Sequence, residues 1–189
     1  MKINDEIKKA LDVLQTGGII IYPTDTIWGI GCDATNEEAV KKIYELKKCS
    51  NSKSMLVLVD NPGKIQSYVE NMPDMAWDLI EMSEKPLTII YSKIKNLAKN
   101  LISEDGSVGI RVTNEVFSKR LCERFRKPIV FTSANVSDEK LPENFSEISE
   151  EIINGVDYVV DFRRNDTTKS KPSSIIKLEE GNVITIINP

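Results

Sequence analysis

The segment that decides the fold is IIIYPTDTIWGIGCDA, residues 19–34, in which an apolar run leads directly into a polar turn. The run is short and rich in isoleucine, so it predicts a buried strand that ends at Pro23. Ligands of α/β sheets bind at the carboxyl ends of strands, which makes Thr24, Asp25 and Thr26 candidates for ligand contacts. A turn in which Thr24 and Asp25 bond their own backbone is the structural alternative.

Outward from this segment, strand and helix patterns alternate along the chain. A first helix is predicted with Asn4 as its cap and Gly17 and Gly18 at its end. Further helices are predicted at residues 37–48 (capped by Asn36), 62–70, 74–83, 95–102, 114–126 and 146–153 (with a capping box at Ser146, Ser149 and Glu150). Strands are predicted at residues 55–60, 86–92, 107–112, 128–133, 157–162, 173–179 and 182–188. This order predicts a single α/β domain over residues 1–189 with a mixed sheet covered by helices.

Composition excludes several kinds of site. The 189 residues contain no histidine, which removes histidine-based nucleophile schemes and histidine metal ligands. Cys32, Cys49 and Cys122 form no CxxC pair, so we expect neither a zinc ribbon nor a disulfide framework. No apolar run approaches the ~20 residues that span a bilayer, and no signal peptide is recognisable. We therefore expect a cytoplasmic protein without a membrane partner or a metal site of its own.

Charge along the chain is uneven. The net charge is −4, which argues against a surface that attracts nucleic acid as a whole. Five lysines nevertheless fall within one short stretch: Lys41, Lys42, Lys47, Lys48 and Lys53. They predict either a solvated helix face or one wall of a phosphate pocket, and the lysines alone do not decide between the two.

Three more features interrupt or end apolar segments. TSANVS, residues 132–137, follows an apolar strand and presents Ser133 and Asn135 as donors and acceptors. Arg111 lies inside the apolar strand SVGIRV, where it needs an anion from a ligand or an internal salt bridge. Lys47 ends a predicted helix and is a candidate for polyphosphate contacts, although the sequence has no GxxxxGK[ST] motif.

Six motifs stand in the order and spacing of one family. PTDTIWGIGCDA, ELKKCSNSKSMLVLV, KPLTIIY, SVGIRV, TSANVS and PSSIIKL together resemble the YrdC-like threonylcarbamoyl-AMP synthases, from about residue 7 onward. The resemblance implies a twisted, mixed and largely parallel sheet with helices on both sides around a large basic cavity. It also implies an enzyme, a nucleotidyltransferase that makes L-threonylcarbamoyl-AMP and pyrophosphate from L-threonine, bicarbonate and ATP. Downstream proteins would transfer the threonylcarbamoyl group to position 37 of tRNA.

The same resemblance implies roles for individual residues. Two residues are implied as catalytic, Lys47 and Arg111. Contacts with ATP are implied for Lys47, Ser107, Ser133 and Asn135. Contacts with L-threonine are implied for Thr24, Arg111 and Ser173.

The chain departs from the family pattern at two arginines. Cys49 stands where the family shows K-x-R, and Asn188 stands where a late strand usually ends in arginine. Neither side chain supplies the permanently charged fork of a guanidinium. Either Lys48 or Lys53 compensates for Cys49, or phosphate affinity is reduced.

A mechanism without a protein nucleophile fits these residues. A threonine carbamate would attack the α-phosphate, helped by the charge of Lys47 and of a Mg²⁺ ion that arrives with ATP. Residues 163–172 are polar and rich in turn formers, which predicts an exposed, mobile loop and a lid over ATP. The alternative function is a non-catalytic paralogue of the same fold that binds double-stranded or other RNA. The acidic net charge and the absence of RNP or KH motifs argue against it.

Overall fold

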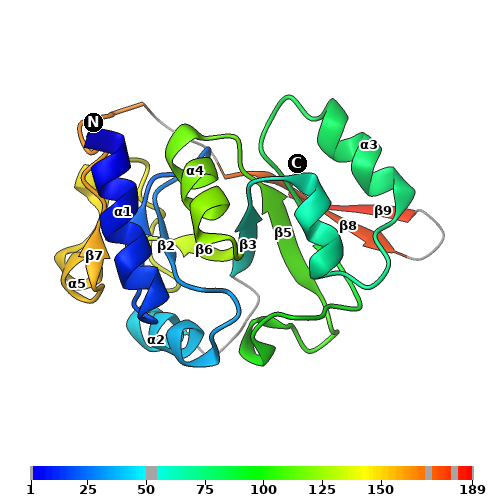
Figure 1. Cartoon of the computed structure of the whole chain (residues 1–189), viewed down its shortest axis with the longest axis horizontal. Helices are drawn as coiled ribbons and strands as arrows, with labels where there is room; N and C mark the ends of the chain where they lie inside the picture. Colours follow the sequence, from blue (N-terminus) through cyan, green and yellow to red (C-terminus); the bar gives the residue numbers. More distant parts are fainter. Residues whose placement is uncertain (1, 50–54, 169–171, 180–182, 189) are drawn as a thin grey trace.

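The core of the molecule is one mixed sheet. The computed structural model describes residues 2–49, 55–168, 172–179 and 183–188. Its strands are β1 (Ile20–Tyr22), β2 (Gly29–Gly31), β3 (Leu56–Val59), β4 (Leu87–Tyr91), β5 (Val108–Val112), β6 (Ile129–Ser133), β7 (Tyr158–Val159), β8 (Ser174–Glu179) and β9 (Val183–Asn188). They lie in the order β7-β1-β2-β6-β3-β5-β4-β8-β9, with β7 and β9 at opposite ends (Figure 1).

The predicted mixed α/β sheet is confirmed, but parallel pairs do not prevail in it. Within the described part of the chain, β1–β7, β3–β5 and β4–β8 are parallel, and the other five pairings are antiparallel. The connections β1–β2 and β8–β9 are too short for a crossover, and only antiparallel strands can be joined so closely. These short connections account for part of the antiparallel excess.

One strand, β2, lies after Pro23 in a segment where no strand was predicted. Glycine is depleted in strands, so the sequence GIG carried no strand signal. The absence of a side chain at Gly29 is required for packing, because a Cβ there would lie 2.3 Å from a ring atom of Phe131. Gly29 pairs with Tyr22 of β1 on one side and with Ser133 of β6 on the other. The ends of two strands that carry predicted site residues therefore meet at the same edge of the sheet.

Five α-helices and three 3₁₀ turns occur in the described chain. They are α1 (Lys2–Gln15), α2 (Glu37–Lys47), α3 (Asp74–Met82), α4 (Val116–Phe125), α5 (Glu150–Asn154), η2 (Pro62–Ser67), η3 (Lys99–Leu101) and η4 (Phe145–Glu147). The predicted cap Asn36 is confirmed, since its side chain accepts hydrogen bonds from two backbone amides of α2. Asn4 is not a cap, because α1 begins at Lys2.

Three other segments that were predicted as helices form 3₁₀ turns in whole or in part. The regions 62–70 and 95–102 form only 3₁₀ turns, and 146–153 is divided between η4 and α5. Asn144, not Ser146, caps η4 by accepting from the Ser146 amide, and Ser149 makes no side-chain cap for α5. Such short segments gain little from propensity, so tertiary contacts decide their form.

Helices cover both faces of the sheet, as predicted. Leu58 of β3 packs in an apolar cluster with residues of α1 and α4, whereas Val57 and Val59 pack in a second cluster with residues of α2 and α3. This alternation places the two clusters on opposite faces of the strand. Figure 1 shows α1 and α4 in front of the part of the sheet that contains β2 and β6.

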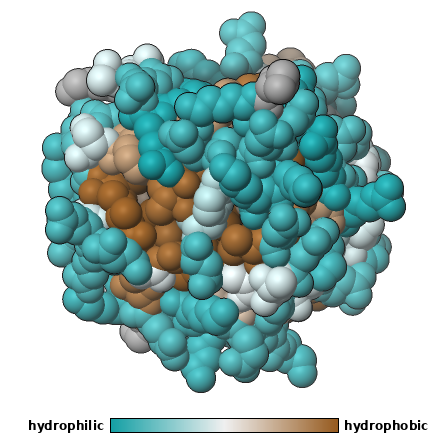
Figure 2. All heavy atoms as spheres, turned by 60° about the vertical axis from the view of Figure 1, so that its left-hand side comes forward, coloured by the Kyte–Doolittle hydropathy of each residue, from teal (hydrophilic) through white to brown (hydrophobic). Residues whose placement is uncertain are grey.

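The surface is mostly hydrophilic on the face turned forward in Figure 2, with apolar side chains gathered in one area. Of the helices described, none combines the length and apolar character that crossing a membrane requires. Apolar atoms at a protein surface are ordinary when they are surrounded by polar groups.

Candidate functional site

Lys47 closes α2 and reaches the end of β6. Its side chain is 2% exposed, and Nζ donates to the backbone oxygens of Ser133 and Asn135, each at 2.6 Å. Nζ also lies 3.3 Å from Asn135 Oδ1. The structure therefore brings together three of the four residues predicted to contact ATP. We call Lys47, Ser133 and Asn135 the lysine cluster.

The pKa of Lys47 is unusual for a lysine side chain. Burial lowers the pKa of Lys47 to about 8, because desolvation disfavours the charged ammonium. The oxygens that Nζ contacts among the described residues are carbonyl, hydroxyl and amide oxygens rather than carboxylates. The charge of Lys47 is thus not neutralised by these contacts, and an anion nearby would stabilise it.

Arg111 is the second buried cation. It lies in β5 opposite Leu58 of β3 and Thr88 of β4, and it is 1% exposed. Its guanidinium carbon lies 4.7 Å from the ring centroid of Phe131. Nη2 lies 3.2 Å from Asp25 Oδ1, an ion-pair distance, but the two groups do not have hydrogen-bond geometry. Burial lowers the pKa of Arg111, and the charge of Asp25 opposes that shift.

Part of the hydrogen-bonding capacity of this arginine is unused among the described residues. In the described part of the structure, Arg111 Nε, Arg111 Nη2 and Asp25 Oδ1 have no hydrogen-bond partner. Leaving buried polar atoms unpaired costs about 1–3 kcal/mol each, and more for charged groups. A ligand that supplies acceptors to Arg111 would therefore bind favourably. The internal salt bridge that the sequence left open is present, but it does not satisfy the guanidinium.

Thr24 and Thr26 lie in the turn that follows β1, and both are 3% exposed. Thr24 Oγ1 accepts from the Thr26 amide at 3.1 Å and donates to the Ile27 carbonyl at 2.8 Å. The alternative of a turn that bonds its own backbone is therefore confirmed for Thr24, whose hydroxyl stabilises the turn in which it lies. Its contact with L-threonine stays a prediction.

Ser173 precedes β8 and is connected to Arg111 through Thr88. It is 4% exposed, and its hydroxyl is 2.8 Å from Thr88 Oγ1. Thr88 is the residue of β4 that pairs with Arg111, so two of the predicted threonine contacts share this neighbour. Asn188 Nδ2 donates to the Ser173 carbonyl at 3.1 Å. The residue that replaces an expected arginine therefore holds the backbone of a predicted site residue.

Ser107, the fourth predicted ATP contact, is joined to a different group. Its hydroxyl donates to Asp105 Oδ1 at 2.5 Å, and Lys177 Nζ lies 2.7 Å from Asp105 Oδ2. Hydrogen bonds from Lys177 and Ser107 hold the pKa of Asp105 at about 2. These contacts do not link Ser107 to the lysine cluster, and its role with ATP stays a prediction.

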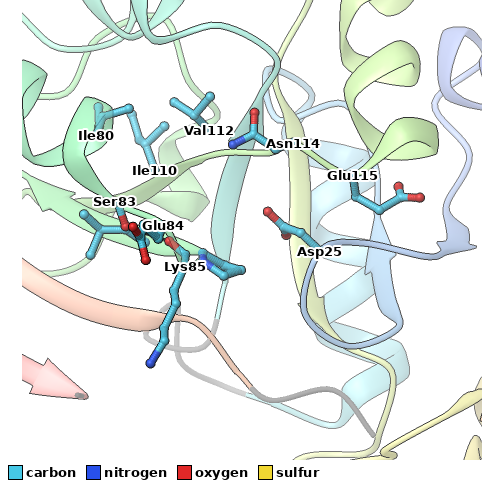
Figure 3. Close-up of a pocket in the computed structure, with 11 residues that line it drawn as sticks. Asp25, Ile80, Ser83, Glu84, Lys85, Ile110, Val112, Asn114 and Glu115 are labelled. Carbon is cyan, nitrogen blue, oxygen red and sulfur yellow. Dashed lines mark hydrogen bonds between the residues drawn. The ribbon is translucent and has the colours of Figure 1, made fainter. Parts of the chain in front are cut away.

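A cleft of about 410 Å³ opens beside Asp25. Residues 83–87, the end of β5 and the following residues Asn114 and Glu115 line it, and Figure 3 shows Asp25 pointing toward it. Its charged lining residues are Asp25, Glu84, Lys85 and Glu115. This cleft is not predominantly basic, so the large basic cavity stays a prediction.

The loop predicted as a lid is anchored in its described part. Arg163 pairs with Asp166 at 2.8 Å and with Glu115 at 3.3 Å. Arg163, Asp166 and Thr168 surround a small hollow together with Thr24 and Thr26. Residues 163–168 therefore lie against the turn after β1, and residues 169–171 are outside the described chain.

Lys48 and Lys53 were the two candidates to replace the arginine that is missing at position 49. Lys48 Nζ forms a 2.7 Å ion pair with Glu151, so Lys48 points to a carboxylate in this structure. Lys53 lies outside the described residues. The structure therefore assigns no substitute for the missing arginine.

Sequence reasoning missed two contributors, Thr88 and Phe131. A signal for Thr88 exists in LTIIY, because a single hydroxyl within an apolar strand needs a partner. Phe131 carries no such signal, since an aromatic residue in a strand is ordinary core. No group of three or more potential metal ligands occurs among the residues that the structure describes.

Comparisons with known proteins found a matching family model and similar sequences. A family model for Sua5, YciO and YrdC proteins, described as telomere recombination, matches residues 12–189. The threonylcarbamoyl-AMP synthase of Pseudoalteromonas translucida is 31% identical over 186 residues, which cover 97% of this chain and 98% of that protein. A protein of Methanocaldococcus jannaschii, provisionally given the same name, is 35% identical over 187 residues, covering 96% of this chain and 86% of that protein.

A solved structure has the same fold. Sua5 of P. abyssi, crystallised in complex with L-threonine, superposes with a TM-score of 0.85 at 22% identity. The match covers 97% of this chain, which spans only 53% of the Sua5 chain. At this identity the likeness shows the fold alone. Together with the family model, these matches establish that the chain belongs to the Sua5/YciO/YrdC family.

Proposed function

We propose that this chain is an L-threonylcarbamoyladenylate synthase that joins L-threonine, bicarbonate and ATP. The observation that carries the proposal is a pair of buried cations with different surroundings, Lys47 at the end of α2 and Arg111 in β5. Among the residues that the structure describes, no carboxylate is bonded to Lys47, and two guanidinium nitrogens of Arg111 have no hydrogen-bond partner. A polyphosphate suits the first environment and an amino acid carboxylate suits the second.

In this proposal the lysine cluster binds the nucleotide. Lys47 would leave part of its contact with the carbonyl oxygens of Ser133 and Asn135 and face the phosphates of ATP. Asn135 Nδ2 donates to the Glu139 backbone at 2.8 Å, which orients the amide that would meet the nucleotide. Ser107 would contact the nucleotide from the start of β5.

The threonine site is proposed around Arg111. The guanidinium would take the carboxylate, with the hydroxyls of Thr24 and Ser173 orienting the rest of the substrate. Thr88 would act through Ser173, because their hydroxyls are 2.8 Å apart. Such preorganised contacts place the reacting amine without a protein nucleophile.

The proposed reaction has two bond-forming steps. The threonine amine and bicarbonate form a carbamate with loss of water, and a carbamate oxygen then attacks the α-phosphorus of ATP. The bond to the β-phosphate breaks and pyrophosphate leaves. Positive charge from Lys47 stabilises the charge that develops on the phosphates.

Magnesium enters this proposal with the substrate. The described residues offer no cluster of three acidic or cysteine ligands, and we propose that the ion arrives bound to ATP. MgATP is therefore the proposed nucleotide substrate, and no step here depends on a protein-bound metal.

The test is pyrophosphate release by the full chain with each substrate omitted in turn. The proposal requires release only when L-threonine, bicarbonate and ATP are all present, together with formation of threonylcarbamoyl-AMP. Release that ignores threonine or bicarbonate would contradict it. We further propose a cytoplasmic enzyme whose product is passed to downstream proteins that modify tRNA.

An RNA titration at several salt concentrations tests the alternative function directly. Binding of RNA through phosphates weakens steeply as salt rises. RNA binding without any ATP-dependent turnover would favour the RNA-binding paralogue and contradict the synthase.

A further inference from the structure

Asp25 has no assigned part in the reaction described above. Its Oδ1 lies 3.2 Å from Arg111 Nη2, yet Oδ1 and two guanidinium nitrogens have no hydrogen-bond partner in the described residues. A buried ion pair normally offsets its desolvation with well-aligned hydrogen bonds. Here the two charges compensate each other while their directional bonds remain available.

The available atoms match the two ends of an α-amino acid. Nε and Nη2 of Arg111 lie on one edge of the guanidinium, the fork that receives both oxygens of a carboxylate. Asp25 Oδ1 is an acceptor, which suits an ammonium N–H. One carbon separates the carboxylate from the ammonium in an α-amino acid, so both groups can meet neighbouring protein groups at once.

Charge balance points to the same ligand. Arg111 and Asp25 together are neutral, and burial makes any uncompensated charge costly. A lone carboxylate beside Arg111 would give the pocket a net negative charge next to Asp25. A zwitterion adds no net charge, so the pair favours an amino acid over the corresponding hydroxy acid.

The cleft described above reaches Asp25, whereas Arg111 is not among its lining residues. Asp25 lines the cleft of about 410 Å³ and points toward it in Figure 3. Pockets for small ligands begin at roughly 300 Å³. Asp25 Oδ1 itself is buried, so a small amino acid in the cleft would reach this oxygen after a change of the Asp25 side-chain rotamer.

We propose that Asp25 binds the ammonium group of the amino acid substrate and makes the site select amino acids over hydroxy acids. This inference rests on the proposed function, in which Arg111 holds the substrate carboxylate. Asp25 is therefore a binding and specificity residue, adjacent to the carboxylate-binding arginine.

The experiment compares three ligands by calorimetry on the full chain. L-Threonine carries both charged groups, 2,3-dihydroxybutyrate has a hydroxyl in place of the ammonium, and L-threoninol lacks the carboxylate. The variants are Asp25→Asn, which keeps the shape and removes the charge, and Glu84→Gln as a matched control. Glu84 lines the same cleft and is exposed.

Asp25→Asn is expected to weaken L-threonine binding roughly 10- to 100-fold, the effect of losing one hydrogen bond to a charged group. The same change should leave 2,3-dihydroxybutyrate binding unchanged or make it tighter, because a repelling carboxylate is gone. L-Threoninol should lose affinity along with L-threonine. Glu84→Gln should alter none of the three, and ATP binding should persist in both variants.

Two results would overturn the inference. One is L-threonine binding within about twofold of wild type in Asp25→Asn, the scatter of an uncoupled site. The other is an equal loss for L-threonine and 2,3-dihydroxybutyrate, which would mean that Asp25 only positions Arg111. If Asp25→Asn does not fold, the test uses the wild-type chain alone. Equal wild-type affinity for L-threonine and 2,3-dihydroxybutyrate would also contradict the inference.

Failure of the proposed function gives a different pattern. A wild-type chain that binds none of the three ligands and releases no threonine-dependent pyrophosphate would contradict the synthase itself. A wild-type chain that is active with threonine, combined with an Asp25→Asn variant of unchanged ligand preference, would contradict only the role of Asp25.

Discussion

The lysine cluster and the ion pair of Arg111 with Asp25 bury a positive charge in two different ways. Lys47 has its donors engaged by carbonyl oxygens, but no carboxylate among those partners balances its charge. Arg111 has a carboxylate at 3.2 Å, but two of its nitrogens have no acceptor in the described chain. Among the described residues, Lys47 lacks a bonded carboxylate and Arg111 lacks hydrogen-bond acceptors. A polyphosphate would supply negative charge to Lys47, and a substrate carboxylate would supply acceptors to Arg111.

The largest effect is expected for Arg111→Met. Removing the guanidinium deletes the donors proposed for the substrate carboxylate, so threonine-dependent pyrophosphate release should fall by about 10²–10³-fold. The matched control is Arg120→Met, an exposed arginine on α4. Activity of Arg111→Met at the level of this control would remove Arg111 from the site. Circular dichroism checks that both variants fold.

Lys47→Met is expected to cost about 10²-fold in turnover, the effect of deleting one preorganised charge contact. Binding of ATP should weaken, while L-threonine binding by calorimetry should stay close to wild type. Lys41→Met, on an exposed part of α2, is the control. A loss of threonine affinity as large as the loss of ATP affinity would contradict the division into two sites.

The pH dependence of ATP binding sharpens the comparison. The folded-state pKa of Lys47 is about 8, so the ammonium is mostly charged at pH 7 and mostly neutral at pH 9. ATP affinity should therefore fall about tenfold over this range in the wild type, as the charged fraction falls. In Lys47→Met the decline should be absent. A wild-type affinity that does not change between pH 7 and pH 9 would show that the charge of Lys47 is not used.

The same pKa predicts a change in stability. The unfolded lysine titrates near 10.5, so between about pH 8 and pH 10.5 the unfolded chain binds more protons than the folded chain. The contribution of Lys47 to the free energy of unfolding should rise with pH across this window, by up to about 1.4 kcal/mol per pH unit. Urea unfolding of the wild type and Lys47→Met at several pH values measures it. Parallel pH profiles for the two proteins would contradict the lowered pKa.

The smallest effect is expected for Cys49→Arg, which restores the K-x-R pattern beside the lysine cluster. One added ion pair at a partly exposed position is worth up to about 1 kcal/mol, so ATP should bind about fivefold tighter or less. Cys49→Met lengthens the side chain without charge and serves as the control. Equal ATP affinity in the two variants would mean that this position does not reach the phosphates.

The strand ends that hold the candidate site were predictable for a physical reason. An apolar run that stops at a polar cluster marks a strand exit, and this pattern located Thr24, Ser133 and Asn135. The short segments were not predictable, because glycine-rich β2 and the 3₁₀ turns η2 and η3 depend on neighbours far along the chain. Family motifs added residue roles that no periodicity could give.

The sequence by itself determined that the chain is an α/β protein with a buried arginine in a strand and a lysine at a helix end, because hydrophobic periodicity and capping are local properties. Only the tertiary structure decided that Lys47 meets carbonyl oxygens and that Arg111 meets Asp25 without hydrogen bonds. The partners of a buried charge lie on other strands, and their geometry depends on sheet order and register, which no local pattern specifies.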